Sequence, residues 1–200
     1  MSGDDMLVGR RGLVLAAPAL ILGAALARPA SALTVTPRQG EGPFYPRILP
    51  SDSDADLTVF DGVTASGEVI EMVGQLFSAN GERISGGEIE IWHCDANGVY
   101  AHVGEQTLPG FQGYGAVRTD ASGGYRFRTT MPGIYPGRTR HIHVKARGVG
   151  ASDLTTQMYF PGEPGNERDG LLRRATNPAA LIAREEPGPP PRYVFDIVLA

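Results

Sequence analysis

Short apolar runs separated by turn-forming residues are the main pattern of the chain after residue 61. Apolar and β-branched side chains fill these runs, and glycine-containing turns at 80–81, 97–98 and 120–124 separate several of them. This pattern is typical of a sandwich or barrel, and we expect an all-β fold, a β-sandwich of mixed and antiparallel strands with long loops. The predicted strands span residues 67–79, 87–94, 124–130, 140–147, 155–160 and 192–199.

Two segments do not follow the strand pattern. Residues 33–61 are rich in proline and aspartate, which predicts an irregular arm that lies on the body of the protein. Residues 165–191 contain apolar positions that could form one or two short helical turns, whose length Pro178 and Pro187 limit. A chain of 200 residues suits one compact domain, which we place at residues 62–200.

The N-terminus has the features of an export signal. Arg10 and Arg11 precede an apolar stretch, and Ala30-Ser31-Ala32 follows it as a small-x-small cleavage signal. The apolar stretch is shorter than the roughly 20 residues that a membrane-spanning helix needs. We expect residues 1–32 to be a twin-arginine signal peptide that is cleaved, so that the mature chain is periplasmic or extracellular and keeps no stable membrane anchor.

Composition narrows the classes of partner. The formal net charge is −4 and the basic residues are scattered, which argues against nucleic acid and anionic lipid as partners and leaves small molecules. Cys94 is the only cysteine, so no intrachain disulfide can form, and we expect it to be a small buried side chain. A homo-oligomer is compatible with this composition.

Two histidines lie one residue apart in the run RTRHIHVKA, residues 138–146. Because side chains alternate along a strand, His141 and His143 share one face, and Ile142 and Val144 lie on the other. Two imidazoles on one rigid face can reach a single metal ion, although such a pair is also found as partly buried or surface histidines. A cupin would add a glutamate soon after the pair, and a structural zinc site would need more cysteines; this sequence has neither.

Four separated blocks resemble the intradiol ring-cleavage dioxygenase family, which includes protocatechuate 3,4-dioxygenase and catechol 1,2-dioxygenase. The resemblance covers most of the chain after the predicted signal, and the blocks follow one another in the family's order. They are TPRQGEGPFYP (36–46), EIEIWHCDANGVYAH (88–102), RTDASGGYRFRTTMPGIYPGRTRHIHVKA (118–146) and LTTQMYFPG (154–162).

The resemblance implies a non-haem Fe(III) centre whose ligands match Tyr100, Tyr135, His141 and His143. Phenolate is a hard anionic donor that stabilises ferric iron. The family's substrate would be a small aromatic diol, a catechol, and it would displace the tyrosine that corresponds to Tyr135. Ring cleavage between the two hydroxylated carbons would incorporate both atoms of O2 and give a cis,cis-muconate-type diacid.

Two further residues match the family's catalytic positions. Arg138 corresponds to the arginine that faces the substrate ring, where a guanidinium stabilises developing negative charge. Gln157 corresponds to a glutamine near the iron, where an amide can orient a ligand by hydrogen bonding. Arg140, next to the first histidine, departs from the small residue that is usual in the family.

Other conspicuous residues have a simpler interpretation, and one other class of protein fits the strand pattern. We expect Trp92 to be a packing residue and neither His93 nor His102 to bind metal, whereas Tyr45 could approach the site from the arm. The alternative class is a non-catalytic transthyretin-like or carboxypeptidase-regulatory-type sandwich, which has no use for the His141 pair.

Overall fold

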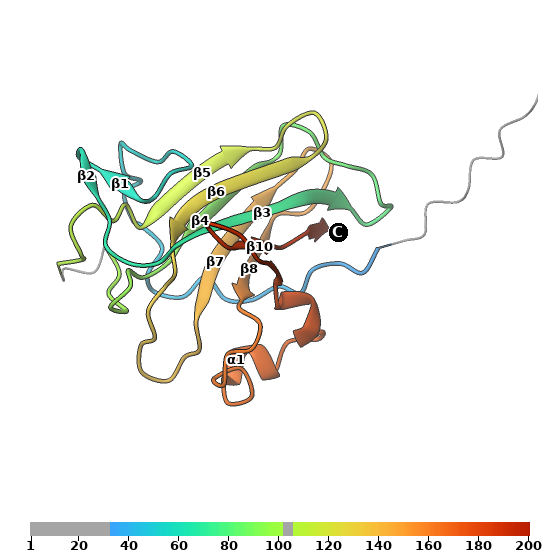
Figure 1. Cartoon of the computed structure of the whole chain (residues 1–200). Helices are drawn as coiled ribbons and strands as arrows, with labels where there is room; N and C mark the ends of the chain where they lie inside the picture. The colour runs from blue at the N-terminus through green and yellow to red at the C-terminus, as the bar shows by residue number, and fades with distance from the viewer. Residues whose placement is uncertain (1–32, 102–105) are drawn as a thin grey trace, which may run out of the picture.

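The computed structural model describes residues 33–101 and 106–200. Two sheets pack face to face, with a small hairpin at one end and short helical turns after the last strand of the first sheet (Figure 1). The first sheet has the order β5-β4-β7-β8 and is antiparallel throughout. Its strands are β4 (Glu88–Trp92), β5 (Tyr114–Arg118), β7 (His141–Arg147) and β8 (Leu154–Tyr159).

The second sheet is mixed and is built around the long strand β3. Strand β6 pairs with β3 in the antiparallel sense, and β10 and β11 pair with it in the parallel sense. Its strands are β3 (Val69–Ser78), β6 (Gly124–Thr130), β9 (Arg184–Glu186), β10 (Arg192–Val194) and β11 (Ile197–Leu199). The remaining elements are the hairpin β1 (Val59–Phe60) and β2 (Val63–Thr64), the helix α1 (Gly170–Arg173) and the 3-10 turn η1 (Pro178–Leu181).

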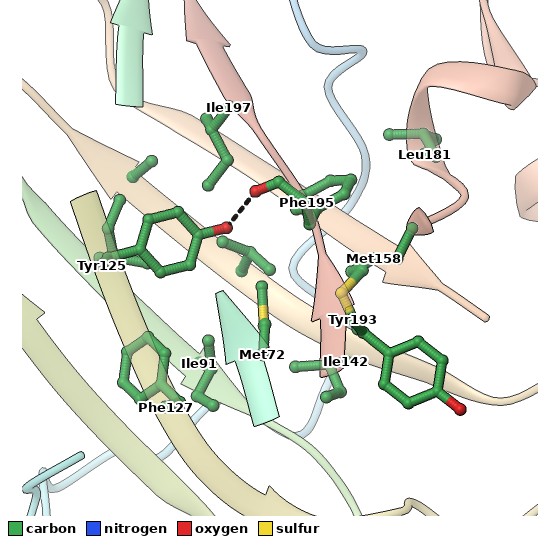
Figure 2. Close-up of a cluster of buried hydrophobic side chains, with 14 of the residues drawn as sticks. Met72, Ile91, Tyr125, Phe127, Ile142, Met158, Leu181, Tyr193, Phe195 and Ile197 are labelled. Atoms are coloured by element: carbon green, nitrogen blue, oxygen red, sulfur yellow. Dashed lines mark hydrogen bonds between the residues drawn. The ribbon is translucent and has the colours of Figure 1, made fainter. Parts of the chain in front are cut away.

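The core lies between the two sheets because each strand turns one set of alternate side chains inward. Ile142, Val144 and Ala146 of β7 are fully buried in this core, which confirms the predicted apolar face. Figure 2 shows Met72 of the second sheet next to Ile142 and Phe127 next to Ile91, and the Tyr125 hydroxyl donating a hydrogen bond to the carbonyl of Phe195. Burial of these side chains supplies the main driving force for folding.

The observed elements confirm the predicted β-sandwich and its short helical turns, with several corrections. The predicted strand 192–199 is two strands, β10 and β11, which pair with β3 in one register on either side of a break at Phe195 and Asp196. At this break the carbonyl oxygen of Phe195 would lie 2.1 Å from a side-chain carbon at Gly74. Strands β5 and β9 were not predicted, since their runs are short and contain charged or small residues. The predicted irregular arm contains β1 at its end, and β2 was also missed.

The predicted signal peptide, residues 1–32, lies outside the described residues and stays a prediction. Within residues 33–101 and 106–200, no helix is both long and apolar enough to cross a membrane.

Candidate metal centre

A row of aligned side chains crosses the outer face of the first sheet. The strand register places Trp92 opposite His143 and His143 opposite Gln157, while His141 lies opposite Tyr159 on the next rung. Alternation along β7 directs both imidazoles away from the apolar core, and both are nevertheless buried. The polar face of this sheet is therefore covered by other parts of the chain.

The four predicted ligands are brought together on this face. The hydroxyl of Tyr135 lies 3.2 Å from Nε2 of His141, and the rings of His141 and His143 are 4.9 Å apart between centroids. The ring of Tyr100 is 5.7 Å from that of Tyr135 and 6.1 Å from that of His143. Two loops supply the tyrosines and one strand supplies the histidines, so the two phenols and two imidazoles line one small space.

Two of these side chains have polar atoms without a partner. The hydroxyl of Tyr100 and both ring nitrogens of His143 are buried and make no hydrogen bond within the described part of the chain. Leaving a buried polar atom unpaired costs about 1–3 kcal/mol, and native proteins keep such groups where a ligand or ion completes them. The donors present, oxygen and nitrogen, fit a hard or borderline metal cation.

His141 is held in the orientation that a metal ligand requires. Its Nδ1 donates a hydrogen bond to the carbonyl of Thr139 at 2.7 Å, which leaves the lone pair on Nε2 and directs it toward Tyr135. Burial, and then the charge of Arg138, lowers the pKa of His141 to about 4. Burial likewise holds the pKa of His143 well below its usual value. Both imidazoles are therefore neutral and able to coordinate a metal at pH 7.

The two phenols need a cation to ionise. Burial raises the pKa of Tyr100 far above that of a free phenol, and burial also raises the pKa of Tyr135. Phenolates in this setting are stable only beside a concentrated positive charge, which a trivalent metal ion supplies. Most metal sites in proteins use three or more His, Cys, Asp or Glu side chains, and no such group among the described residues could hold a metal ion. The candidate site differs because two of its four side chains are tyrosines.

Arg138 joins the candidate ligands to a buried carboxylate. Its Nη1 lies 3.4 Å from the Tyr135 hydroxyl and 3.3 Å from Nε2 of His141, while its Nε donates to Asp169 at 2.7 Å. Its Nη2 donates to Gln157 at 2.5 Å and to the hydroxyl of Tyr159 at 3.1 Å. Arg138 and Gln157 thus lie together beside the candidate ligands, where the sequence placed them.

Asp169 and Tyr159 are residues of the site that the sequence interpretation missed. Asp169 caps α1 by accepting from the backbone of Leu171 and Leu172, so one carboxylate fixes both the helix and Arg138. Burial alone would raise its pKa, but these hydrogen bonds and Arg138 outweigh burial and lower the pKa. A signal for Tyr159 was present, because it follows Gln157 by two positions and therefore shares its face of the strand.

The arm covers the candidate centre. Phe44 stacks on the ring of Tyr100 with centroids 4.1 Å apart, and a side-chain carbon at Gly42 would lie 3.5 Å from the ring of His143. Tyr45, which the sequence left open, packs edge-on against Trp92 at 5.0 Å, and its hydroxyl donates a hydrogen bond to Glu90 at 2.7 Å. The arm therefore closes the site with aromatic rings.

Trp92, His93 and Cys94, which we expected to be structural, are all buried. His93 turns toward the other sheet, where Thr129 donates to its Nε2 at 2.8 Å and its own Nδ1 donates to the carbonyl of Cys94 at 2.7 Å. Cys94 is buried and unpaired. Trp92 is fully buried and stacks on His143 with centroids 4.8 Å apart, so it also supports a candidate ligand. His102 lies outside the described residues.

Arg140, which departs from the family pattern, is turned away from the four candidate ligands. It pairs with Glu163 at 2.9 Å and donates to the carbonyl of Pro132 at 2.7 Å. Its charge is therefore matched outside the site.

Known proteins with similar sequences are dioxygenases. The sequence model of the family described as Dioxygenase matches residues 40–200. Catechol 1,2-dioxygenase of Acinetobacter baylyi is 31% identical over 195 residues, which cover 82% of this chain and 62% of that protein. The protocatechuate 3,4-dioxygenase beta chain of Burkholderia cepacia is 35% identical over 169 residues, which cover 75% of this chain and 72% of that protein.

Solved structures share the fold. The dioxygenase domain of a dioxygenase carbohydrate-binding protein fusion from Streptomyces sp. SirexAA-E is 36% identical with a TM-score of 0.67, covering 83% of this chain and 98% of that one. A catechol 1,2-dioxygenase from Acinetobacter sp. is 30% identical with a TM-score of 0.66, covering 82% of this chain and 62% of that one. The chain belongs to the intradiol ring-cleavage dioxygenase family.

Proposed function

We propose that this chain is a non-haem Fe(III) dioxygenase that opens the ring of a catechol between its two hydroxylated carbons. Both atoms of O2 enter the product, a cis,cis-muconate-type diacid. One observation carries the proposal: two phenols and two imidazoles converge on one covered space, and buried atoms of Tyr100 and His143 have no partner among the described residues.

Tyr100, Tyr135, His141 and His143 would hold the iron. Two phenolates and two neutral imidazoles favour the ferric state, because hard anionic oxygen donors stabilise the higher charge. When bound, Fe(III) supplies Lewis acidity that draws electron density from a chelating diol and prepares the ring for reaction with O2.

Tyr135 is suited to receive a proton from the arriving diol. It is only partly buried, and its hydroxyl lies between His141 and Arg138. Because burial raises the pKa of Tyr135, its phenolate would be a stronger base than a free phenolate and would accept a hydroxyl proton from the diol.

Arg138 would stabilise negative charge that develops on the substrate. Its guanidinium is fixed by Asp169, Gln157 and Tyr159. A preorganised cation in a water-poor site stabilises developing charge without having to reorient during the reaction. Gln157 would act as a positioning residue, since its carbonyl oxygen accepts from Arg138 and its amide donates to the carbonyl of Gly40 at 3.3 Å.

A purified, iron-loaded sample tests the proposal. We expect a broad visible absorption band from phenolate-to-iron charge transfer, together with oxygen uptake and a diacid product on addition of a catechol. Tyr100→Phe should lose iron and colour. The matched control is Tyr193→Phe, which removes a hydroxyl from a buried tyrosine of β10 in the second sheet and should keep both iron and colour.

A colourless iron-loaded protein would contradict the proposal and favour the alternative, a non-catalytic transthyretin-like or carboxypeptidase-regulatory-type module. That alternative gives no role to the unpartnered buried atoms of Tyr100 and His143.

Export by the twin-arginine route is part of the same proposal. It is supported by Arg10-Arg11, the apolar stretch after them and the small residues at 30–32. Fusion of residues 1–32 to a reporter should give an exported, cleaved product, and replacing both arginines by lysine should keep the reporter inside the cell. Export that is unchanged by this replacement would contradict the proposed route.

A further inference from the structure

A pocket of about 370 Å³ adjoins the candidate centre through Arg138. Arg138 lines this pocket, and its Nη1 lies 3.4 Å from the Tyr135 hydroxyl and 3.3 Å from Nε2 of His141. The volume is in the range of pockets that take small organic ligands. A larger hollow of about 620 Å³, lined mainly by the second sheet and by the end of β5, shares no residue with the centre. The smaller pocket is therefore the one placed to receive part of a substrate.

The walls of this pocket suit an organic side chain. Two loops, 134–139 and 163–169, form it. Ile134 is 58% exposed, and with Pro164 it offers apolar surface to a hydrocarbon spacer. A catechol whose hydroxyls lie at the candidate ligands could extend a ring substituent into this space.

The charges around the pocket leave one cation unmatched. The carboxylate of Asp169 is 2.7 Å from Nε of Arg138, and that of Glu163 is 2.9 Å from Nε of Arg140. Arg168 also lines the pocket, and no carboxylate lies within 4.0 Å of its guanidinium among residues 33–101 and 106–200. The guanidinium of Arg168 is therefore free to bind an anionic group that enters the pocket.

Arg168 is also anchored close to the centre. Its Cα is about 3.8 Å from that of Asp169, the residue that holds Arg138. Its backbone N–H donates to the carbonyl of Gly165 at 3.0 Å, which fixes the loop from which the side chain extends. Arg138 and Arg168 therefore line the same pocket, and the backbone from which the Arg168 side chain extends is held by this hydrogen bond.

We propose that Arg168 is a specificity-determining residue that binds the carboxylate of an acidic side chain on the catechol ring. A planar guanidinium can donate two parallel hydrogen bonds to a carboxylate, which fixes both the identity and the direction of the substituent. This inference rests on the proposed function for the orientation of the ring.

The test compares two ligands that differ in charge and by one methyl group: dihydrocaffeate, a catechol with a propanoate side chain, and its methyl ester. We expect the wild-type protein to prefer the acid by about tenfold in kcat/KM and in Kd. Arg168→Gln should remove this preference and leave values for the ester within about twofold, while Arg168→Lys should keep part of it. The control, Arg173→Gln, removes an exposed charge on α1 that does not line the pocket and should change neither.

The outcomes separate this inference from the proposed function. An acid preference that survives in Arg168→Gln, or its absence from the wild type, overturns the role of Arg168. If neither compound is consumed but calorimetry shows an acid preference that Arg168→Gln removes, the acid-binding role stands and the proposed dioxygenase activity fails.

Discussion

The two sheets of this protein share one apolar core, but their outer faces differ. On the first sheet the outward side chains of Trp92, His143 and Gln157 are buried. On the second sheet, Arg126 and Arg192 point outward from β6 and β10 with side chains 64% and 47% exposed, and both pair with Glu71 of β3. The histidine end of the first face therefore holds neutral or unpaired groups without water. Ion pairs on this face, such as Lys145–Glu41, lie further along β7, and the second face holds partly exposed ion pairs.

The arm, residues 33–61, causes much of this difference. The backbone N–H of Gln39 donates to the carbonyl of Thr155 on β8, and Phe44 and Gly42 lie against Tyr100 and His143. Water is excluded from this face, so its pKa values shift and its unpaired atoms become costly. Strand alternation alone makes a polar face, and covering that face makes it a metal-binding site.

The largest expected effect comes from exchanging one buried histidine on each side of the first sheet for leucine. His143→Leu should abolish iron binding and yet make the iron-free protein more stable by about 1 kcal/mol, because it removes nitrogens that have no partner in the described residues. His93→Leu should still bind iron, but its free energy of unfolding should fall by about 1–3 kcal/mol, because the Thr129 hydroxyl and the carbonyl of Cys94 lose their hydrogen-bond partner. Metal analysis and urea unfolding measure both changes. Iron retained in His143→Leu would show that His143 is not a metal ligand.

Removal of an arginine from each outer face should give the next largest contrast. Arg138→Met leaves the fully buried carboxylate of Asp169 without its cation, and we expect a loss of about 2–4 kcal/mol in unfolding free energy and roughly 100-fold in turnover. Arg192→Met, on the open face, should cost less than about 1 kcal/mol and leave turnover unchanged. Equal losses in the two variants would show that the first face is not shielded from water.

A pH dependence should report how deeply the core side of the first sheet is buried. Burial lowers the pKa of His93 to about 4, so the folded state keeps this imidazole neutral while the unfolded chain takes up a proton below about pH 6.5. As the pH is lowered from about 6.5 to about 4, the free energy of unfolding should therefore decrease, with this residue contributing roughly 3 kcal/mol. For iron-free His93→Gln, the free energy of unfolding measured in urea should depend less steeply on pH, because one proton fewer is taken up on unfolding. An unchanged slope would mean that His93 is protonated in the folded state.

The smallest effect should come from the contact that holds the arm on the first sheet. Lys145, the only lysine of the chain, lies 2.5 Å from the carboxylate of Glu41 and 3.4 Å from the ring centre of Tyr45. Lys145→Met should cost about 1 kcal/mol and make the arm more susceptible to limited proteolysis, and Lys145→Arg should restore most of the loss. Cleavage of the arm at the wild-type rate in Lys145→Met would show that other contacts hold it.

Local patterns were sufficient to predict much of this molecule. The alternation of residues 140–147 predicted β7, its apolar face and the common direction of His141 and His143. Residues 165–191 were expected to form short turns, as α1 and η1 do. The hairpin β1–β2 and strand β5 were missed because their runs are too short or too polar to show a period of two.

The candidate site was predictable only where residues matched a known family. Tyr100, Tyr135, Arg138 and Gln157 were assigned by resemblance, because no spacing along one chain shows that a loop after β4 and another after β6 approach β7. Asp169 matched no quoted block, and its role became visible only in its contact with Arg138.

The sequence by itself determined the strands, the turns between them and the face on which the two histidines lie, since these depend on the repeat of a single strand and on residues next to one another. The tertiary structure decided which polar side chains lose water, which phenols join the imidazoles and which arginine remains unmatched beside them. Those properties depend on the packing of segments that are distant along the chain, including the arm over His143 and the loop of Arg168 beside Arg138. Local sequence patterns do not show which distant segments pack together.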